Sequence, residues 1–136
     1  MTSPSSIDLL KQATLADKRI AAAIVFGSQA RGTARLDSDI DLAVLMDHPF
    51  KLSENYLDTL GTLCIKAQRD VHLVDLEATS LELQRAIFTH GLTLFDRSAG
   101  QLNRVRKQSA INYVDAEYIR RILDEHLGRR LEKSLG

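Results

Sequence analysis

The chain contains a single cysteine, Cys64, so it cannot form an internal disulfide bond. Its apolar runs fall far short of the roughly 18 to 20 residues that a membrane-spanning helix needs. The first six residues are polar and lack the charged and then apolar leader of a secreted protein. Together these absences predict a protein of the cytoplasm with no membrane contact.

The chain also lacks net charge, because 18 Lys and Arg residues balance 18 Asp and Glu residues. The balance is uneven: residues 1–96 hold nine basic and thirteen acidic residues, whereas residues 97–136 hold nine and five. A nucleic-acid-binding surface would be more basic and would dominate the charge of the whole chain, so we expect no nucleic-acid contact. The basic tail is then either a solvated helical face or a docking surface for an acidic patch on a protein partner.

No cluster of His and Cys has the spacing of a zinc site, and no Ser-His-Asp arrangement can be argued from the sequence. At 136 residues, with 44% hydrophobic and 26% charged residues, the composition is ordinary for one globular domain. Function must therefore be sought in a more local pattern.

That local pattern is a glycine and two aspartates beside predicted strands. Ile20–Phe26 (IAAAIVF) has the length and composition of a buried strand, and it ends abruptly at Gly27 and Ser28. After ten intervening residues, Asp39 and Asp41 alternate with apolar residues, so a second strand can bury one face and keep both carboxylates on the other. Two aspartates are thus predicted to share one site.

The residue types suit a phosphate cradle beside a metal site. Gly27 has no side chain to block a triphosphate, and Ser28 offers a hydroxyl and a backbone N–H at what could be the start of a short helix. Neighbouring carboxylates are stable with Mg²⁺ or Mn²⁺ between them, and two such ions can clamp an in-line displacement at phosphorus. Arg31 and Arg35 could neutralise phosphate charge. The alternative is an ordinary turn before an acidic strand.

The segment GSQARGTARLDSDIDLAV resembles the core motif of the polymerase-beta-type nucleotidyltransferases, in particular the minimal members of that superfamily. Asp70–Asp75 (DVHLVD), a following helix and Gly91–Asp96 (GLTLFD) are similar to the second half of those proteins, so the resemblance covers about residues 20–97. It implies an α/β (α+β) fold, with a small mixed sheet flanked by helices. Residues 1–97 would form this palm domain, and residues 98–136 a helical extension that packs on the palm, binds a partner, or both.

The resemblance also implies a function. Minimal members are commonly antitoxins paired with a HEPN-domain ribonuclease toxin, and they transfer AMP from ATP to a toxin tyrosine with the help of two Mg²⁺ ions. We therefore expect a hetero-oligomer with a HEPN-family toxin. The roles that the resemblance implies are phosphate or nucleotide binding for Gly27, Ser28, Arg31 and Arg35, and metal binding and catalysis for Asp39 and Asp41. Two alternatives are an antitoxin that acts by binding alone and a nucleotidyltransferase with a small-molecule acceptor.

One position departs from the family pattern. The family usually has a third aspartate on the next strand, three residues before the Asp of a Val-Asp-Leu, and here that residue is His72. Asp70 would face the same side of the strand, because side chains alternate. Three interpretations stay open: His72 acts as a neutral general base, Asp70 replaces the aspartate, or activity is reduced.

Turn residues and apolar periodicity predict the remaining elements. The second half of the chain ends in helical segments whose apolar stripe would partly cover the sheet and partly face another chain. The predicted helices are Ser5 or Ser6 to Ala16, Leu52–Ala67, Thr79 or Ser80 to Phe88, Ala99–Asn112 and Ala116–Leu131. The predicted strands are Arg19–Phe26, Asp39–Met46, Val71–Leu76 and a short edge strand at Leu92–Phe95.

Overall fold

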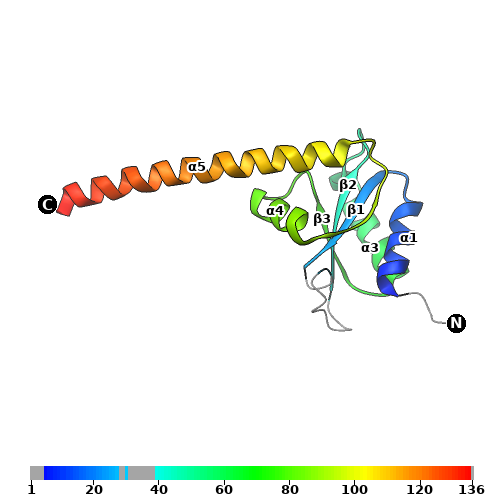
Figure 1. The fold of residues 1–136 in the computed structure, drawn as a ribbon. Coiled ribbons are helices and arrows are strands. Elements are labelled where there is room, and N and C mark those ends of the chain that lie inside the picture. The colour runs from blue at the N-terminus through cyan, green and yellow to red at the C-terminus, as the bar shows by residue number, and fades with distance from the viewer. Residues whose placement is uncertain (1–4, 28–29, 31–38, 136) are drawn as a thin grey trace.

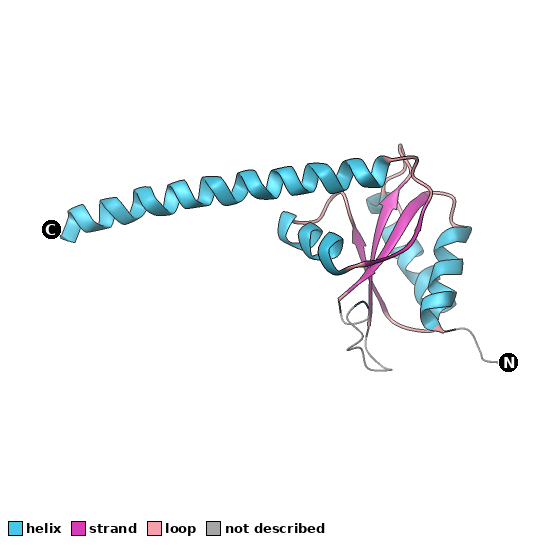
Figure 2. Ribbon diagram, viewed as in Figure 1, coloured by secondary structure: helices cyan, strands magenta, loops and turns pink. Residues whose placement is uncertain are grey.

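The structure of the protein is a computed structural model, which describes residues 5–27, 30 and 39–135. Four strands and their flanking helices form the palm, and one long helix follows it (Figures 1 and 2). Each strand lies within one residue of its predicted bounds, and the predicted α/β class is confirmed. The elements are α1 (Ser6–Ala16), β1 (Ile20–Phe26), β2 (Ile40–Met46), the 3₁₀ turn η1 (Leu52–Glu54), α3 (Tyr56–Ala67), β3 (Val71–Asp75), α4 (Leu81–His90), β4 (Leu92–Asp96) and α5 (Gln101–Leu135).

The strands form one mixed sheet in the order β3-β2-β1-β4. β1 pairs antiparallel with both β2 and β4, whereas β2 and β3 are parallel. A parallel pair needs a crossover connection, and the segment that contains η1 and α3 supplies it. As a result, the end of β1 and the beginnings of β2 and β3 meet at one end of the sheet.

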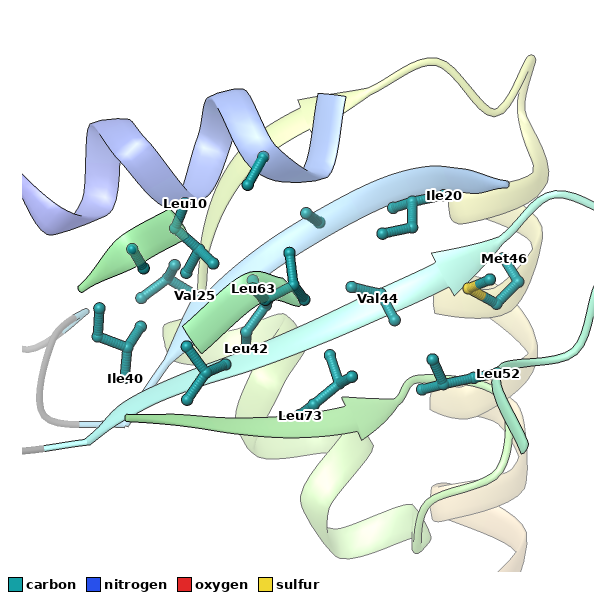
Figure 3. Packing of buried hydrophobic residues seen from close by; sticks show 14 residues of the cluster. Leu10, Ile20, Val25, Ile40, Leu42, Val44, Met46, Leu52, Leu63 and Leu73 are labelled. Carbon is teal, nitrogen blue, oxygen red and sulfur yellow. The ribbon is translucent and has the colours of Figure 1, made fainter. Parts of the chain in front are cut away.

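Helices cover both faces of the sheet. On one face, Leu10 of α1 and Leu63 of α3 pack against strand residues such as Leu42 (Figure 3). On the other face, Ile87 of α4 and Leu102 of α5 belong to a second buried cluster. All seven residues of β1 are buried because both of its faces are covered, which explains why its sequence is a continuous apolar run.

The beginnings of the helices follow their sequence signals. Ser5 caps α1, with its Oγ accepting a hydrogen bond from the Asp8 backbone N–H and the Asp8 carboxylate accepting one from the Ser5 N–H. Ser80 caps α4 in the same way, because its Oγ accepts from the backbone N–H of Leu83 at 3.2 Å. Both predicted N-termini are therefore confirmed.

The predicted helix Leu52–Ala67 is interrupted in the structure. Leu52–Glu54 forms the separate turn η1, and Asn55 adopts a non-helical conformation before α3 begins at Tyr56. Asn is a poor helix former because its side chain competes for backbone hydrogen bonds. The prediction was right for α3 itself, whose bounds match the apolar stripe that starts at Tyr56.

The two helical segments predicted at the C-terminal end are one helix. α5 runs for 35 residues without a break, because no Gly or Pro lies between the two predicted segments. Leu102 and Ser109 are buried against the palm, and the later turns project beyond it (Figure 1). The whole of α5, with 35 residues, is about 50 Å long. None of the helices in the described ranges is both long and apolar enough to cross a membrane.

Candidate active site

Gly27 follows directly after β1 and adopts a left-handed backbone conformation, with φ of 69°. A Cβ atom at this position would overlap Oδ2 of Asp41 and would lie 3.2 Å from its Cγ. Glycine is therefore required twice over, for the backbone angle and for the space. The sequence predicted a glycine that admits a triphosphate, but it did not show that the carboxylate of Asp41 lies against the same position.

The two aspartates lie at the beginning of β2. Asp41 belongs to the strand and is opposite Phe26 in the antiparallel pair, and its side chain is 28% exposed. Asp39 is an exposed residue one position before the strand. Side chains alternate along extended backbone, so the prediction that both carboxylates share one side requires the strand geometry to continue back to Asp39. Ser28, Arg31 and Arg35, the other residues of the predicted motif, lie outside the described residues.

His72 is opposite Asp41 in the parallel pair of β2 and β3. Its Nδ1 lies 3.1 Å from Oδ1 of Asp41, and its side chain is 60% exposed. The two atoms are within hydrogen-bonding distance, and the ring donates to Asp41 when Nδ1 carries the proton. The carboxylate of Asp41 is thus held between His72 on one side and Gly27 on the other.

Asp70 has a different environment. Its backbone carbonyl accepts a hydrogen bond from the Ile40 N–H at 2.9 Å, which ties the beginnings of β2 and β3 together. Its exposed side chain lines a surface hollow at the end of α3, together with Cys64, Ile65, Gln68 and Arg69. Of the two candidates for the third position, His72 is therefore the one that contacts Asp41.

The donor atoms at this end of the sheet fit a divalent cation. Carboxylate oxygens and an imidazole nitrogen are common metal ligands, and Asp41 and His72 offer both beside Gly27. Within residues 5–27, 30 and 39–135, no three side chains of His, Cys, Asp or Glu are already grouped as a metal site. The residues that would hold an ion here are Asp39, Asp41 and His72.

Two carboxyl groups away from this site have shifted pKa values. The hydrogen bonds from the Arg19 guanidinium lower the pKa of Asp17 at the turn between α1 and β1. Burial raises the pKa of Asp75 at the end of β3, and the nearby charge of Glu77 adds to the effect. Both groups lie away from Gly27, so these shifts bear on stability rather than on the candidate site.

Sequence comparison places the palm in a known family. The family model described as "Polymerase beta, Nucleotidyltransferase" matches residues 9–100, a range that includes every predicted site residue. By sequence, no curated protein matches the chain.

Solved structures with the same fold extend over nearly the whole chain. A toxin-antitoxin structure with AMP-PNP has 23% identity and a TM-score of 0.68, and the match covers 90% of this chain and 95% of that chain. A Shewanella oneidensis structure of a tri-AMPylated HEPN toxin with an MNT antitoxin has 21% identity and a TM-score of 0.61, covering 89% and 91%. The MntA-HepT toxin-antitoxin structure also has 21% identity and a TM-score of 0.61, covering 89% and 92%. At these identities the likeness shows a shared fold.

Proposed function

The chain belongs to the polymerase beta nucleotidyltransferase family, and from this premise we propose that it transfers AMP from ATP to a protein hydroxyl. The acceptor we propose is a tyrosine of a cognate HEPN-family toxin, which makes the protein the antitoxin of a hetero-oligomeric pair in the cytoplasm. The observation that carries the proposal is the meeting of Gly27, Asp41 and His72 at the end of the sheet. The similar solved structures, which include an AMPylated HEPN toxin, support the choice of acceptor.

Each residue of the predicted glycine and aspartate motif has a role in this proposal. Asp39 and Asp41 would hold Mg²⁺ or Mn²⁺, and the bound ions would supply positive charge to the phosphates. The absent side chain of Gly27 makes room for the carboxylate of Asp41, and the triphosphate would approach the bare backbone of Gly27. Ser28 would donate hydrogen bonds to the phosphates, and Arg31 and Arg35 would neutralise the β- and γ-phosphates or the departing pyrophosphate.

The transfer is a displacement at the α-phosphorus of ATP. The acceptor hydroxyl oxygen bonds to the α-phosphorus, the bond from this phosphorus to the bridging oxygen breaks, and pyrophosphate leaves with the electron pair. The hydroxyl proton passes to water. The contact of His72 with Asp41 supports His72, rather than Asp70, as the third residue of the site.

α5 offers a surface for the toxin. One face of the helix is occupied by α4, because Arg85 stacks 4.1 Å from the ring centroid of Tyr113 and Glu82 lies 3.8 Å from Arg120. Another face carries exposed apolar side chains at spacings of three and four residues. This apolar stripe consists of Ile111, Val114, Tyr118 and Ile122.

The charge of the tail suits the same role. Residues 97–136 have a net charge of +4, whereas the rest of the chain has −4. A partner with an apolar strip and acidic flanks would match the apolar stripe and its surroundings. We therefore propose that the toxin docks along α5, while the palm modifies it.

A second function, neutralisation of the toxin by binding alone, is favoured by one observation. The third carboxylate of the family is replaced by His72, so the metal site differs from that of an ordinary member. In this alternative the apolar stripe of α5 binds and neutralises the toxin, and the nucleotide site binds ATP weakly.

Intact mass spectrometry tests the proposed function. The chain would be incubated with ATP, Mg²⁺ or Mn²⁺, and the HEPN-domain protein expected to be encoded beside its gene. A mass gain of the partner by roughly 329 Da or its multiples corresponds to transferred AMP. The double variant Asp39→Asn/Asp41→Asn should abolish this gain, whereas Asp47→Asn, an exposed aspartate beyond the other end of β2, should leave it unchanged.

The same experiment separates the two functions. If the partner binds the wild-type chain stably but gains no mass with either Mg²⁺ or Mn²⁺, this result would contradict AMP transfer and favour neutralisation by binding. Loss of the mass gain in the double variant, with binding retained, would support the enzyme.

A further inference from the structure

The side chain of His72 is held beside Asp41 by the pairing of β2 and β3. The flanking pairs, Ile40 with Val71 and Leu42 with Leu73, are buried. A slip in register would expose these apolar residues, so the pair of Asp41 and His72 is fixed by the core beneath it. The imidazole is nevertheless 60% exposed, so a ligand at the end of the sheet can reach it.

The donor set therefore differs from a set of three carboxylates. Mg²⁺ strongly favours oxygen ligands in near-octahedral geometry, and an imidazole nitrogen is a poor ligand for it. First-row transition ions accept imidazole readily, and among them Mn²⁺ also suits carboxylates. Replacing one carboxylate with imidazole also removes one negative charge from the site, which weakens binding of a hard cation such as Mg²⁺ most.

We propose that His72 is a metal ligand and that it makes this site prefer Mn²⁺ to Mg²⁺. The proposal rests on the proposed function, because it concerns the ion held by Asp39 and Asp41. It goes beyond that function by naming the residue that decides which ion is used.

The ligand role is distinct from the general-base role. An imidazole that binds a metal ion through one nitrogen carries a proton on the other and has no lone pair left to accept the acceptor's proton. Direct measurement of metal binding therefore separates the two roles without any measurement of transfer.

The test measures Mn²⁺ binding to the purified full chain by electron paramagnetic resonance, in which free Mn²⁺ gives a signal that is lost on binding. The chain would be mixed with α,β-methylene-ATP, whose α–β link cannot be broken, and bound Mn²⁺ would then be displaced with Mg²⁺. We expect His72→Asp to lower the preference for Mn²⁺ over Mg²⁺ by roughly ten-fold or more. Electron spin echo measurements should show ¹⁴N modulation from bound Mn²⁺ in the wild-type chain, and His72→Asp should weaken it.

A matched control is present in the chain. His48 makes the same kind of contact, with its Nε2 2.9 Å from Oε1 of Glu77, but it lies beyond the other end of β2. His48→Gln should leave both the ion preference and the ¹⁴N modulation unchanged. Asp70→Asn tests the other candidate for the third position and should also have no effect.

An unchanged ion preference in His72→Asp, or an equal effect of His48→Gln, would overturn the proposal. So would a loss of Mn²⁺ binding in Asp70→Asn alone. A failure of the proposed function would give a different result, in which Asp39→Asn/Asp41→Asn leaves Mn²⁺ binding intact. If that double variant loses Mn²⁺ while His72→Asp has no effect, only the role of His72 is refuted.

Discussion

Gly27 and Asp41 touch: the carboxylate of Asp41 occupies the space that any side chain at position 27 would need. The two residues are close because β1 ends where β2 begins, with Phe26 directly opposite Asp41. Gly27, of the candidate phosphate cradle, and Asp41, the candidate metal ligand, therefore form one structural unit. A substitution at either residue would disturb the position of the other.

This unit predicts the effect of Gly27→Ala. The added Cβ would displace the carboxylate of Asp41 and strain a backbone with φ of 69°, at a cost of about 1–3 kcal/mol in the free energy of unfolding. We expect weaker binding of Mn²⁺ with ATP, measured by calorimetry, and a lower midpoint in urea unfolding. Gly61→Ala is the matched control: Gly61 lies inside α3 with open space around it, so alanine should stabilise the helix by up to about 1 kcal/mol. Equal effects of the two variants would contradict the prediction.

The hydrogen bonds between Asp17 and Arg19 should make the protein less stable in acid. Its carboxylate accepts hydrogen bonds from Nε and Nη2 of Arg19 at 3.0 and 2.8 Å, and these bonds lower its pKa below the ordinary value of 3.8. The resulting stabilisation is present above that value and is lost as the pH falls through the lower pKa of the folded state. Asp17→Asn should therefore lower the free energy of unfolding by about 1 kcal/mol near neutral pH and by less in acid.

Urea unfolding of this variant at several pH values checks the prediction. Asp124→Asn, which changes an exposed aspartate on α5, serves as the control for the loss of one charge. A destabilisation by Asp17→Asn that is constant from neutral pH to acid would show that the ionised form of Asp17 does not contribute.

For Asp75 we expect the opposite pH dependence of the contribution to the free energy of unfolding. Burial raises its pKa above 3.8, so its contribution to stability is present at low pH and is lost as the pH rises through the folded-state pKa. Asparagine could keep the acceptor for the Glu77 N–H, which lies 3.1 Å from Oδ1, without the buried charge. We expect Asp75→Asn to raise the free energy of unfolding at neutral pH by up to about 1 kcal/mol, measured by urea unfolding. A marked loss of stability at neutral pH would refute this account.

The apolar stripe of α5 predicts a binding defect that spares the fold. Ile111→Asp with Ile122→Asp places two charges where the toxin is proposed to dock, and each should weaken the complex by at least about 1 kcal/mol. Both side chains are about half exposed, so the melting temperature of the free chain should change little. Binding would be measured by calorimetry. Ile65→Asp, at a position 78% exposed on α3, is the control and should bind the partner normally.

Local signals in the sequence predicted most of the fold. Ser5 and Ser80 indicated where two helices begin, because capping depends on residues only three positions apart. The apolar run Ile20–Phe26 predicted a buried strand, and both faces of β1 are covered in the structure. These features are read from neighbouring residues, which is why they were predictable.

Features that depend on distant residues were not. The contact of His72 with Asp41 results from a strand register across 31 positions of the chain, and nothing local encodes it. Gly91 at the end of α4 has an extended conformation, and the reason for glycine there is that a Cβ would meet the Ile87 carbonyl and the side chain of Ile24. The roles of Asp39, Asp41, Asp70 and His72 as catalytic residues stay predictions.

The direction of β4 limits which acceptors can reach the site. β4 runs antiparallel to β1, so Asp96 pairs with Ala22 and α5 begins at the end of the sheet away from Gly27. A molecule bound along the apolar stripe must therefore extend past α4 before it can place a hydroxyl at Asp41. We infer that a short peptide carrying the acceptor tyrosine is too small to use both places at once, and that only an intact folded partner gains the local concentration that makes modification fast.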